Sequence, residues 1–179
     1  MATKRTVYIS GGAIEATVTD KAAAVHEWVR DTLSPYGARP MVVGLDCEWN
    51  CNSMTNKAAT LHLCFGIKCL IIQLLYLDYI PQSIKDFFCD SNVTFVGVEI
   101  GADVQAQRQL AMERWPSKFY QKPGLKTLAY EVVGLAMEKP MHVCSSNWEA
   151  RILDVKQIEY ACIDAYACYR IGHKLLRGN

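Results

Sequence analysis

The chain has 179 residues and a formal net charge of +1, and 51% of its residues are hydrophobic. This length suits one domain, residues 1–179, with a substantial apolar core. The balanced charge excludes a bulk polycation, so any contact with nucleic acid must come from a local basic patch or from bound metal ions.

The cysteines predict a reduced protein. There are eight of them, none in a C-x-x-C pair, and the N-terminal sequence is not that of a secretory signal peptide. We therefore expect buried thiols, no structural zinc site, and a cytoplasmic or nuclear location. The most apolar stretch, residues 61–77, is broken by Gly66 and Lys68, so it predicts a strand–turn–strand unit and no membrane span.

The first half of the chain predicts a hairpin followed by two helices and four strands. Residues 6–9 and 14–19 are rich in β-branched and aromatic types, and Gly11-Gly12 permits a tight turn between them. The remaining expected elements are a helix capped by Asp20 and ending at Leu33, strands 41–47, 59–65 and 69–75, a helix 81–88 and a strand 93–98.

The second half predicts helices over residues 103–114 and 124–136, an irregular segment 138–149, and a long final helix capped by Asp154 and ending near residue 176. No repeat or domain boundary interrupts this order. A meander of strands followed by strand–helix units predicts an α/β fold with a mixed sheet flanked by helices.

Acidic residues stand at the ends of predicted strands and on the final helix. Asp46 and Glu48 close the strand 41–47, and alternate residues of a strand point to one face. Asp103 follows the strand 93–98, at the kind of sheet edge where ligands gather. Tyr160 and Asp164 are four residues apart and share a helix face. We expect these side chains to converge.

Together these residues predict a site for two Mg²⁺ or Mn²⁺ ions, held by Asp46, Glu48, Asp103 and Asp164. Hard oxygen ligands suit these ions better than zinc. Two such ions can clamp a phosphate, one activating the attacking water and the other stabilising the leaving oxygen. Tyr160 can hydrogen-bond the phosphate or orient the water. The pattern indicates hydrolysis of a phosphodiester.

Each piece also has an ordinary structural explanation. A D-x-E sequence after a strand is common by chance, and Asp103 alone is typical of a helix N-cap. Tyr160 and Asp164 alone fit a half-buried aromatic residue and a solvated acid. These separate explanations do not predict the order and the contexts of all five residues, which favour one shared site.

The motifs resemble those of the DnaQ-like 3′–5′ exonucleases of the DEDD superfamily, which have a ribonuclease H-like fold. Asp46 and Glu48 match the first motif, Asp103 the second, and Tyr160 with Asp164 the third. The tyrosine resembles the DEDDy branch, which includes ribonuclease D and the Werner syndrome exonuclease domain. The resemblance implies a metal-dependent 3′–5′ exonuclease.

The resemblance spans nearly the whole chain and is strongest with small plant Werner-like exonucleases. The short length and the lack of a helicase segment suggest a stand-alone exonuclease. The RISC-interacting clearing exonucleases, which trim uridylated RNA fragments and form a hexameric ring, are similar, and the motifs fit this type and the DNA-directed Werner type alike. A homo-oligomer and an Argonaute/RISC partner are therefore expected from the resemblance alone. The segments that carry it are VVGLDCEWN, ATLHLCFGIKCLIIQLL, FVGVEIGADV, LKTLAYEVVG and SNWEARILDVKQIEYACIDAYACYRIG.

Two residues depart from the pattern of these relatives. Glu99 stands in the second motif where a small residue is usual, and it either adds charge repulsion to the site or faces solvent. His62 stands where glutamine is frequent, on a strand near the first motif. His62 is expected to be a structural histidine or a substrate contact, and neither departure removes a metal ligand.

Substrate contacts are expected from two groups of residues. Trp49, Leu61 and His62 lie near the first motif and could meet the terminal bases, although core packing is at least as good an explanation of Leu61. A basic series beyond the second motif could line a backbone groove or form a solvated face. Its members are Arg108, Arg114, Lys118, Lys122 and Lys126.

These observations leave three functional hypotheses. The first is an exonuclease that shortens single-stranded RNA from its 3′ end to nucleoside monophosphates. The second is a Werner-type enzyme that acts on the 3′ ends of single-stranded DNA. The third is a binding module that keeps the fold but has no turnover. Because all four carboxylates and the tyrosine are present, an active enzyme is favoured over a binding module. The resemblance to the clearing exonucleases slightly favours RNA over DNA as its substrate.

Overall fold

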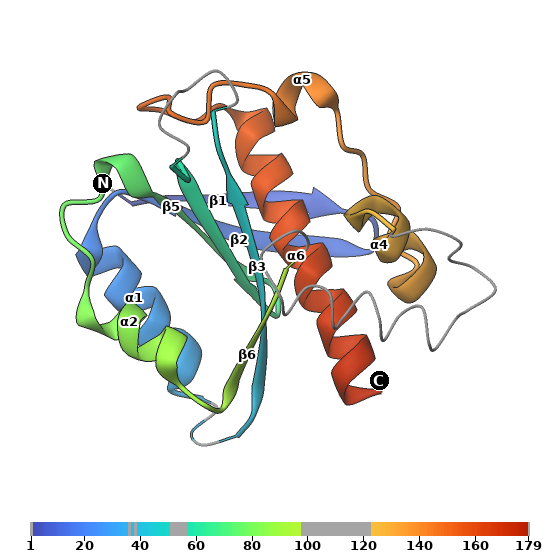
Figure 1. The fold of residues 1–179 in the computed structure, drawn as a ribbon, viewed down its shortest axis with the longest axis horizontal. Helices are drawn as coiled ribbons and strands as arrows, with labels where there is room; N and C mark the ends of the chain where they lie inside the picture. Colours follow the sequence, from blue (N-terminus) through green and yellow to red (C-terminus); the bar gives the residue numbers. More distant parts are fainter. Residues whose placement is uncertain (1, 36, 38, 51–56, 98–122, 179) are drawn as a thin grey trace.

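The computed structural model describes residues 2–35, 37, 39–50, 57–97 and 123–178. These residues form a sheet with helices packed around it, as Figure 1 shows. In chain order the elements are β1 (Thr3–Ile9), β2 (Gly12–Thr19), α1 (Ala22–Leu33), β3 (Met41–Glu48), β4 (Thr60–Phe65), β5 (Lys68–Gln73), the 3₁₀ turn η1 (Leu74–Tyr76), α2 (Gln82–Cys89), β6 (Val93–Val96), α4 (Leu125–Val133), α5 (Met141–Cys144) and α6 (Val155–Arg177).

The strands form one mixed sheet of six in the order β1-β2-β5-β4-β3-β6. β2 pairs parallel with β5 and β3 parallel with β6, whereas the other neighbours are antiparallel. The carboxyl ends of β2, β5, β3 and β6 therefore lie at one edge of the sheet. This confirms the α/β fold with a mixed sheet, and it defines the edge at which ligands are expected.

Helices cover both faces of the sheet (Figure 1). Alternation along β3 separates two apolar clusters, because Val43 and Leu45 pack with α1 and α2 while Val42 packs with α4 and α6. The same alternation turns Asp46 and Glu48 to the α6 side. The sequence of β3 thus fixes which face of the sheet carries the two acids.

The long helix α6 lies directly on β3. A side chain at Gly44 of β3 would collide with the backbone of α6 at Ala165 and Tyr169, and one at Gly172 of α6 would collide with Val96. Only glycine permits such close approach of two backbones. Gly44 therefore sets the distance between β3 and α6, the two elements that carry acidic residues.

Both ends of α6 are well defined. Asp154 accepts a hydrogen bond from the backbone N–H of Gln157 at 2.8 Å, and the Gln157 side chain accepts one from the Asp154 N–H at 3.0 Å. This reciprocal capping box confirms the predicted start of the helix. The helix ends at Gly178, whose φ of 76° is left-handed.

Several sequence predictions differ from the structure. The predicted strand 69–75 ends at Gln73, because η1 follows, and the predicted helix 124–136 ends at Val133. Asp20 does not cap α1, since the cap position is Lys21, without a side-chain hydrogen bond, and Asp20 pairs with Arg151 instead. The segment 138–149 is not wholly irregular, because it contains the short helix α5. The predicted helix 103–114 and the second motif from residue 98 onward lie outside the described residues.

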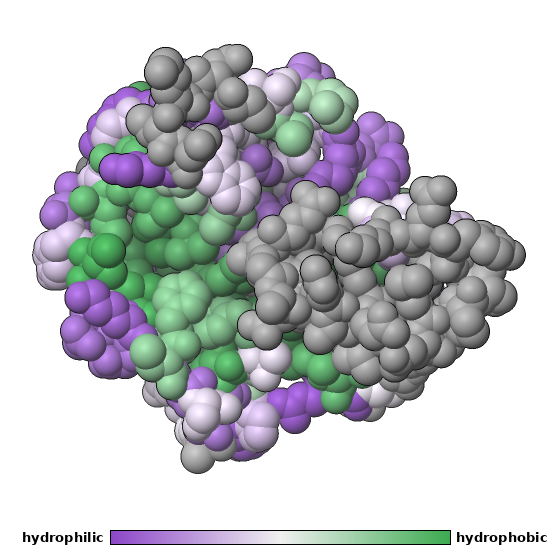
Figure 2. Space-filling model, viewed as in Figure 1, coloured by the Kyte–Doolittle hydropathy of each residue, from purple (hydrophilic) through white to green (hydrophobic). Residues whose placement is uncertain are grey.

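One apolar area is visible on the face drawn in Figure 2, over α2 and the edge strand β6. Phe88 is 40% exposed there, and its ring centroid lies 4.7 Å from that of Phe95. Neighbouring residues 98–122 are not described, so this area carries no further argument. Among the helices described, none combines the length and the apolar character that crossing a bilayer requires.

Candidate active site

Three carboxylates converge at the sheet edge, on the α6 side. Oxygen atoms of Asp46, Glu48 and Asp164 all lie within 4.8 Å of one another. The first two end β3, and Asp164 comes from the third turn of α6, where it is only 1% exposed. A set of oxygen ligands this close together can bind a hard divalent cation such as Mg²⁺ or Mn²⁺.

The proximity of these acids changes their ionisation. Burial, with the charges of Asp46 and Asp164, raises the pKa of Glu48 to about 8. Burial also raises the pKa of Asp164 to about 7, against the opposing effect of the Lys139 ammonium. Without a metal ion the cluster therefore holds protons near neutral pH. A divalent ion would have to displace these protons.

Lys139 brings a positive charge into the cluster. Its Nζ lies 2.5 Å from Oδ2 of Asp164 and 5.2 Å from the centre of the Tyr160 ring. Burial lowers the pKa of Lys139, but the nearby carboxylates of Asp164, Asp46 and Glu48 have the larger combined effect and raise this pKa above its ordinary value. The ammonium thus occupies a place where a metal cation would be attracted, which supports the fit of the site to cations.

Replacing Lys139 by methionine is expected to tighten Mn²⁺ binding by about tenfold, since the ion would no longer compete with an ammonium for Asp164. Isothermal titration calorimetry measures the dissociation constant. Lys156→Met is a matched control, because it removes an ammonium that is also paired with a carboxylate, with Lys156 Nζ 2.8 Å from Oε2 of Glu159, but outside the acidic cluster. Weaker Mn²⁺ binding in Lys139→Met than in the wild type would contradict the competition.

His62 holds the carboxylate of Asp46. The imidazole is fully buried, with Nδ1 3.1 Å from Oδ2 of Asp46 and Nε2 2.8 Å from the hydroxyl of Thr60. Strand pairing explains this contact, since His62 of β4 is directly opposite Asp46 of β3. A completely buried ring cannot touch a nucleic-acid strand, so the expected substrate contact of His62 is corrected to a contact with Asp46.

Replacing His62 by alanine is expected to weaken Mn²⁺ binding by about 10- to 100-fold, because Asp46 would lose the group that orients it. Glutamine at the same position can keep one hydrogen bond to Asp46, so His62→Gln should retain most of the affinity. Calorimetric titration with Mn²⁺ compares the two variants. Equal losses in both would show that the volume of the ring matters and its hydrogen bond does not.

Tyr160 lies beside the carboxylates with its ring held by Trp148. The tyrosine is 5% exposed, and its ring centroid lies 5.9 Å from that of Trp148. Trp148 is itself 5.9 Å from His62 and donates its indole N–H to the Cys144 carbonyl. Burial and the nearby Asp164 raise the pKa of Tyr160 far above its ordinary value. The phenol therefore stays protonated and acts as a hydrogen-bond donor.

The segment before α6 is pinned to the strand ends around this site. Gln157 donates to the Asn147 carbonyl at 3.1 Å, and Gln73 donates to the carbonyls of Ala150 and Arg151 at 3.1 and 3.2 Å. Asn50, which follows β3, donates to Glu149 at 3.2 Å. These bonds explain how Trp148 keeps its place against Tyr160. The sequence prediction singled out neither Trp148 nor Lys139.

The other predicted site residues lie in different surroundings. Trp49 follows β3 directly and is 44% exposed, so it remains available for contact with a base. Leu61 packs against the apolar cluster on the α1 and α2 face, away from the carboxylates, which favours its core role over base stacking. Lys126 is exposed in the first turn of α4. The residues outside the described part are Asp103, Lys118, Lys122, Glu99, Arg108 and Arg114.

Comparison with known proteins gives one consistent family. A family model described as 3′-5′ exonuclease matches residues 17–178. The chain is 29% identical over 164 residues to Exonuclease 3'-5' domain-containing protein 2 of Drosophila melanogaster, which covers 84% of this chain and 28% of that protein. The chain spans about half or less of the length of the curated relatives it matches.

Solved structures share the fold. The Nibbler EXO domain of Aedes aegypti superposes with a TM-score of 0.69 at 16% identity, covering 90% of this chain and 88% of that domain. RNase D of Escherichia coli, an exoribonuclease involved in structured RNA processing, superposes with a TM-score of 0.64 at 17% identity. That match covers 89% of this chain and 44% of RNase D.

Proposed function

The chain belongs to the 3′-5′ exonuclease domain family, and on this premise we propose that it shortens single-stranded RNA from the 3′ end, using divalent metal ions. Membership in the family supports 3′–5′ exonuclease activity. The substrate and the mechanism are proposals. The single observation that carries them is the convergence of Asp46, Glu48 and Asp164 within 4.8 Å, with Tyr160 beside them.

The residues present fit a pair of Mg²⁺ or Mn²⁺ ions. The donor set consists of carboxylate oxygens, and an ammonium cation already sits against Asp164. Asp46, Glu48 and Asp164 would hold the ions together with Asp103, which the second motif assigns to the set. When bound, the ions supply positive charge to the scissile phosphate and lower the pKa of the attacking water.

The protein groups position the reactants. Tyr160, which keeps its proton, donates a hydrogen bond to the attacking water or to a phosphate oxygen. Lys139, which pairs with Asp164 here, would be placed to pair with a non-bridging phosphate oxygen when Asp164 holds an ion. Water adds to phosphorus, the bond from phosphorus to the 3′ oxygen of the preceding nucleotide breaks, and that oxygen takes up a proton. The products are a nucleoside 5′-monophosphate and a shortened strand with a free 3′ hydroxyl.

RNA is favoured over DNA for two reasons. The motifs resemble those of RNA-clearing exonucleases, and the structural neighbour RNase D acts on RNA. Single-stranded DNA is the second candidate substrate, in keeping with the resemblance to Werner-type enzymes. A single strand of either kind suits this site better than a duplex, because its 3′ end must reach carboxylates that are largely buried.

The direct test uses matched RNA and DNA strands, single and duplex, labelled at the 5′ end or at the 3′ end and incubated with Mn²⁺. A 3′–5′ exonuclease converts the 5′-labelled strand into a ladder and releases the 3′ label at once as a mononucleotide. RNA should be shortened faster than DNA. Internal fragments, or no shortening of any strand by the folded protein, would refute the proposal and favour a binding module.

Metal ions are expected to stabilise the protein more as the pH rises. The folded pKa values of Glu48 and Asp164, about 8 and about 7, exceed the ordinary 4.5 and 3.8. The folded state thus binds more protons than the unfolded state between about pH 4 and 8, and stability without metal falls as the pH rises through this window. Bound Mg²⁺ offsets the repulsion that deprotonation creates.

Scanning calorimetry with EDTA or with excess Mg²⁺ measures this effect. At a concentration of 100 times the Kd at pH 8, Mg²⁺ should raise Tm by roughly 5–10 °C at pH 8, and the same concentration should raise it by less at pH 6, where Kd is larger. Asp164→Asn should lose most of the shift, whereas Glu159→Gln, on the same helix, should keep it. A shift that is equal at both pH values would show that the carboxylates do not take up protons in the folded protein.

A further inference from the structure

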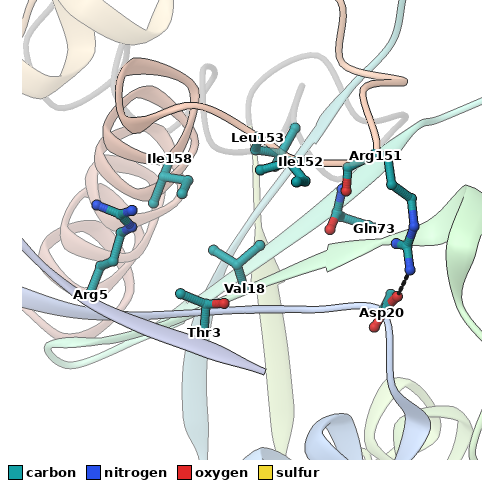
Figure 3. A pocket seen from close by; sticks show the side chains of 9 residues that line it. All are labelled: Thr3, Arg5, Val18, Asp20, Gln73, Arg151, Ile152, Leu153 and Ile158. Carbon is teal, nitrogen blue, oxygen red and sulfur yellow. Dashed lines mark hydrogen bonds and ion pairs between the residues drawn. The ribbon is translucent and has the colours of Figure 1, made fainter. Parts of the chain in front are cut away.

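A second concave site lies at the same sheet edge, on the β1 and β2 side of α6. It is a cavity of about 380 Å³ between the strand ends, the segment 151–153 and the first turn of α6. Its apolar walls include Val18, Leu153 and Ile158, and its polar walls include Arg5, Arg151 and Asp20. Figure 3 shows Arg5 at one end of the cavity and the pair Arg151–Asp20 at the other.

The cavity carries an excess of positive charge. Arg151 lies 2.5 Å from a carboxylate oxygen of Asp20, and its guanidinium stacks 4.6 Å above the centre of the Tyr76 ring. Hydrogen bonding to Arg151 lowers the pKa of Asp20 to about 2, so this pair is an ion pair at neutral pH. Arg5 has no ion-pair or hydrogen-bond partner among the residues that the structure describes. Its charge is thus available to an anion.

We propose that this cavity binds one nucleotide, with its phosphate against Arg5 and its base against the apolar wall formed by Val18, Leu153 and Ile158. Guanidinium groups pair well with phosphate oxygens, and a partly apolar wall suits the face of a base. The volume is within the range of small-ligand sites. The inference rests on the proposed function, which brings nucleotides to this edge of the sheet.

The position of the cavity allows two sources of the nucleotide. Glu48, Thr60 and Gln73 are register partners on β3, β4 and β5, and β2 is the next strand. At about 4.8 Å between strands, β2 lies roughly 14 Å from β3. An upstream nucleotide of a strand whose 3′ end lies among the carboxylates can span such a distance. A free nucleoside monophosphate is the other source.

The test compares Arg5→Ala with Lys4→Ala. Lys4 is the neighbouring residue on β1, it lines a different pocket, and its side chain is 73% exposed near Glu15, so it controls for loss of one positive charge. Fluorescence anisotropy in EDTA measures the binding of labelled RNA strands of two and of eight nucleotides. Calorimetry measures the binding of uridine 5′-monophosphate. Arg5→Lys tests whether the charge alone restores binding, and circular dichroism checks the fold.

If an upstream nucleotide fills the cavity, Arg5→Ala weakens binding of the eight-nucleotide strand about tenfold more than that of the dinucleotide. If a free nucleotide fills it, uridine monophosphate binds the wild type and loses about tenfold in Arg5→Ala, while the ratio of the two RNA affinities stays constant. Lys4→Ala should match the wild type in both arms, and Arg5→Lys should recover part of the loss.

Equal small changes in Arg5→Ala and Lys4→Ala, or no change in either, would overturn the inference. The activity of the wild type separates this failure from a failure of the proposed function. If the wild type shortens RNA in Mn²⁺ but binding does not depend on Arg5, the proposed function stands and the cavity is not a nucleotide site. If binding depends on Arg5 but the protein has no nuclease activity, the cavity is a nucleotide site and the proposed function is wrong.

Discussion

Replacing Asp164 by asparagine is expected to lower turnover at least about 10³-fold, or about 4 kcal/mol of transition-state stabilisation. Asparagine has nearly the same shape, but its neutral amide cannot supply the negative charge that two divalent ions need. Asp164 is 1% exposed and its oxygens lie within 4.8 Å of those of Asp46 and Glu48. Among the described residues, no other carboxylate lies within this distance of both Asp46 and Glu48, so none can replace Asp164 as a ligand.

The rate constant of single-turnover cleavage of a 5′-labelled RNA strand in saturating Mn²⁺ measures this loss. Glu159→Gln is the matched control, because Glu159 is on the same helix, is paired with Lys156, and has a side chain that is 38% exposed. The control should retain wild-type turnover. Melting of both variants in EDTA checks the fold, which should survive, since removing a buried charge relieves repulsion with Asp46. A loss of less than tenfold in Asp164→Asn would place the reaction elsewhere.

The convergence of three acids could be predicted from the sequence because their positions follow from local periodicity. Asp46 and Glu48 alternate at the end of an apolar strand, and Asp164 sits one turn beyond Tyr160 on a long helix. Local geometry and one assumption, that strand ends gather at one edge, were enough to bring three carboxylates together. The structure does not test the role of Asp103, which stays a prediction.

The contacts of His62 and Leu61 could not be read from the sequence, because they depend on pairing between strands. His62 meets Asp46 only because β4 pairs with β3 in one register, and a shift of one residue would have turned Leu61 to the acids instead. Both residues were candidates for substrate contact. The observed register buries His62 behind Asp46 and turns Leu61 to the opposite core.

Lys139 and Asp20 show how distant contacts override local signals. Lys139 lies outside any regular element, beside Pro140, so no periodic pattern directs its ammonium to Asp164. Asp20 has the residue type and the position of an N-cap, yet its carboxylate pairs with Arg151, 131 residues away. A charge pair on a carboxylate whose side chain is only 4% exposed outweighs the weaker preference for capping in this case.

The same sheet edge therefore carries two kinds of charge. Carboxylates gather where β3 meets α6, and guanidinium groups gather where β2 and β5 end. The segment before α6 is held by hydrogen bonds from Asn50, which follows β3, and from Gln73, which lines the cavity. A strand bound at both sites would contact this fixed segment, which favours a defined path over loose electrostatic attachment.

Replacing Tyr160 by phenylalanine is expected to lower turnover about 100-fold while Mn²⁺ affinity stays within about twofold of the wild type. Phenylalanine keeps the ring that packs 5.9 Å from Trp148 and lies 5.2 Å from the Lys139 ammonium. Only the hydroxyl is lost. Since burial holds the pKa of Tyr160 far above its ordinary value, the hydroxyl acts as a donor to the water or the phosphate and not as a base.

Two measurements separate this role from metal binding. Single-turnover cleavage of labelled RNA gives the rate constant, and calorimetric titration with Mn²⁺ gives the affinity. Tyr166→Phe is the matched control, because Tyr166 is on the same helix and its hydroxyl accepts a hydrogen bond from Arg170 at 2.8 Å, away from the carboxylates of the site. If Tyr160→Phe lost as much Mn²⁺ affinity as Asp164→Asn, the tyrosine would belong to the metal-binding set. If turnover were unchanged, Lys139 alone would have to position the phosphate.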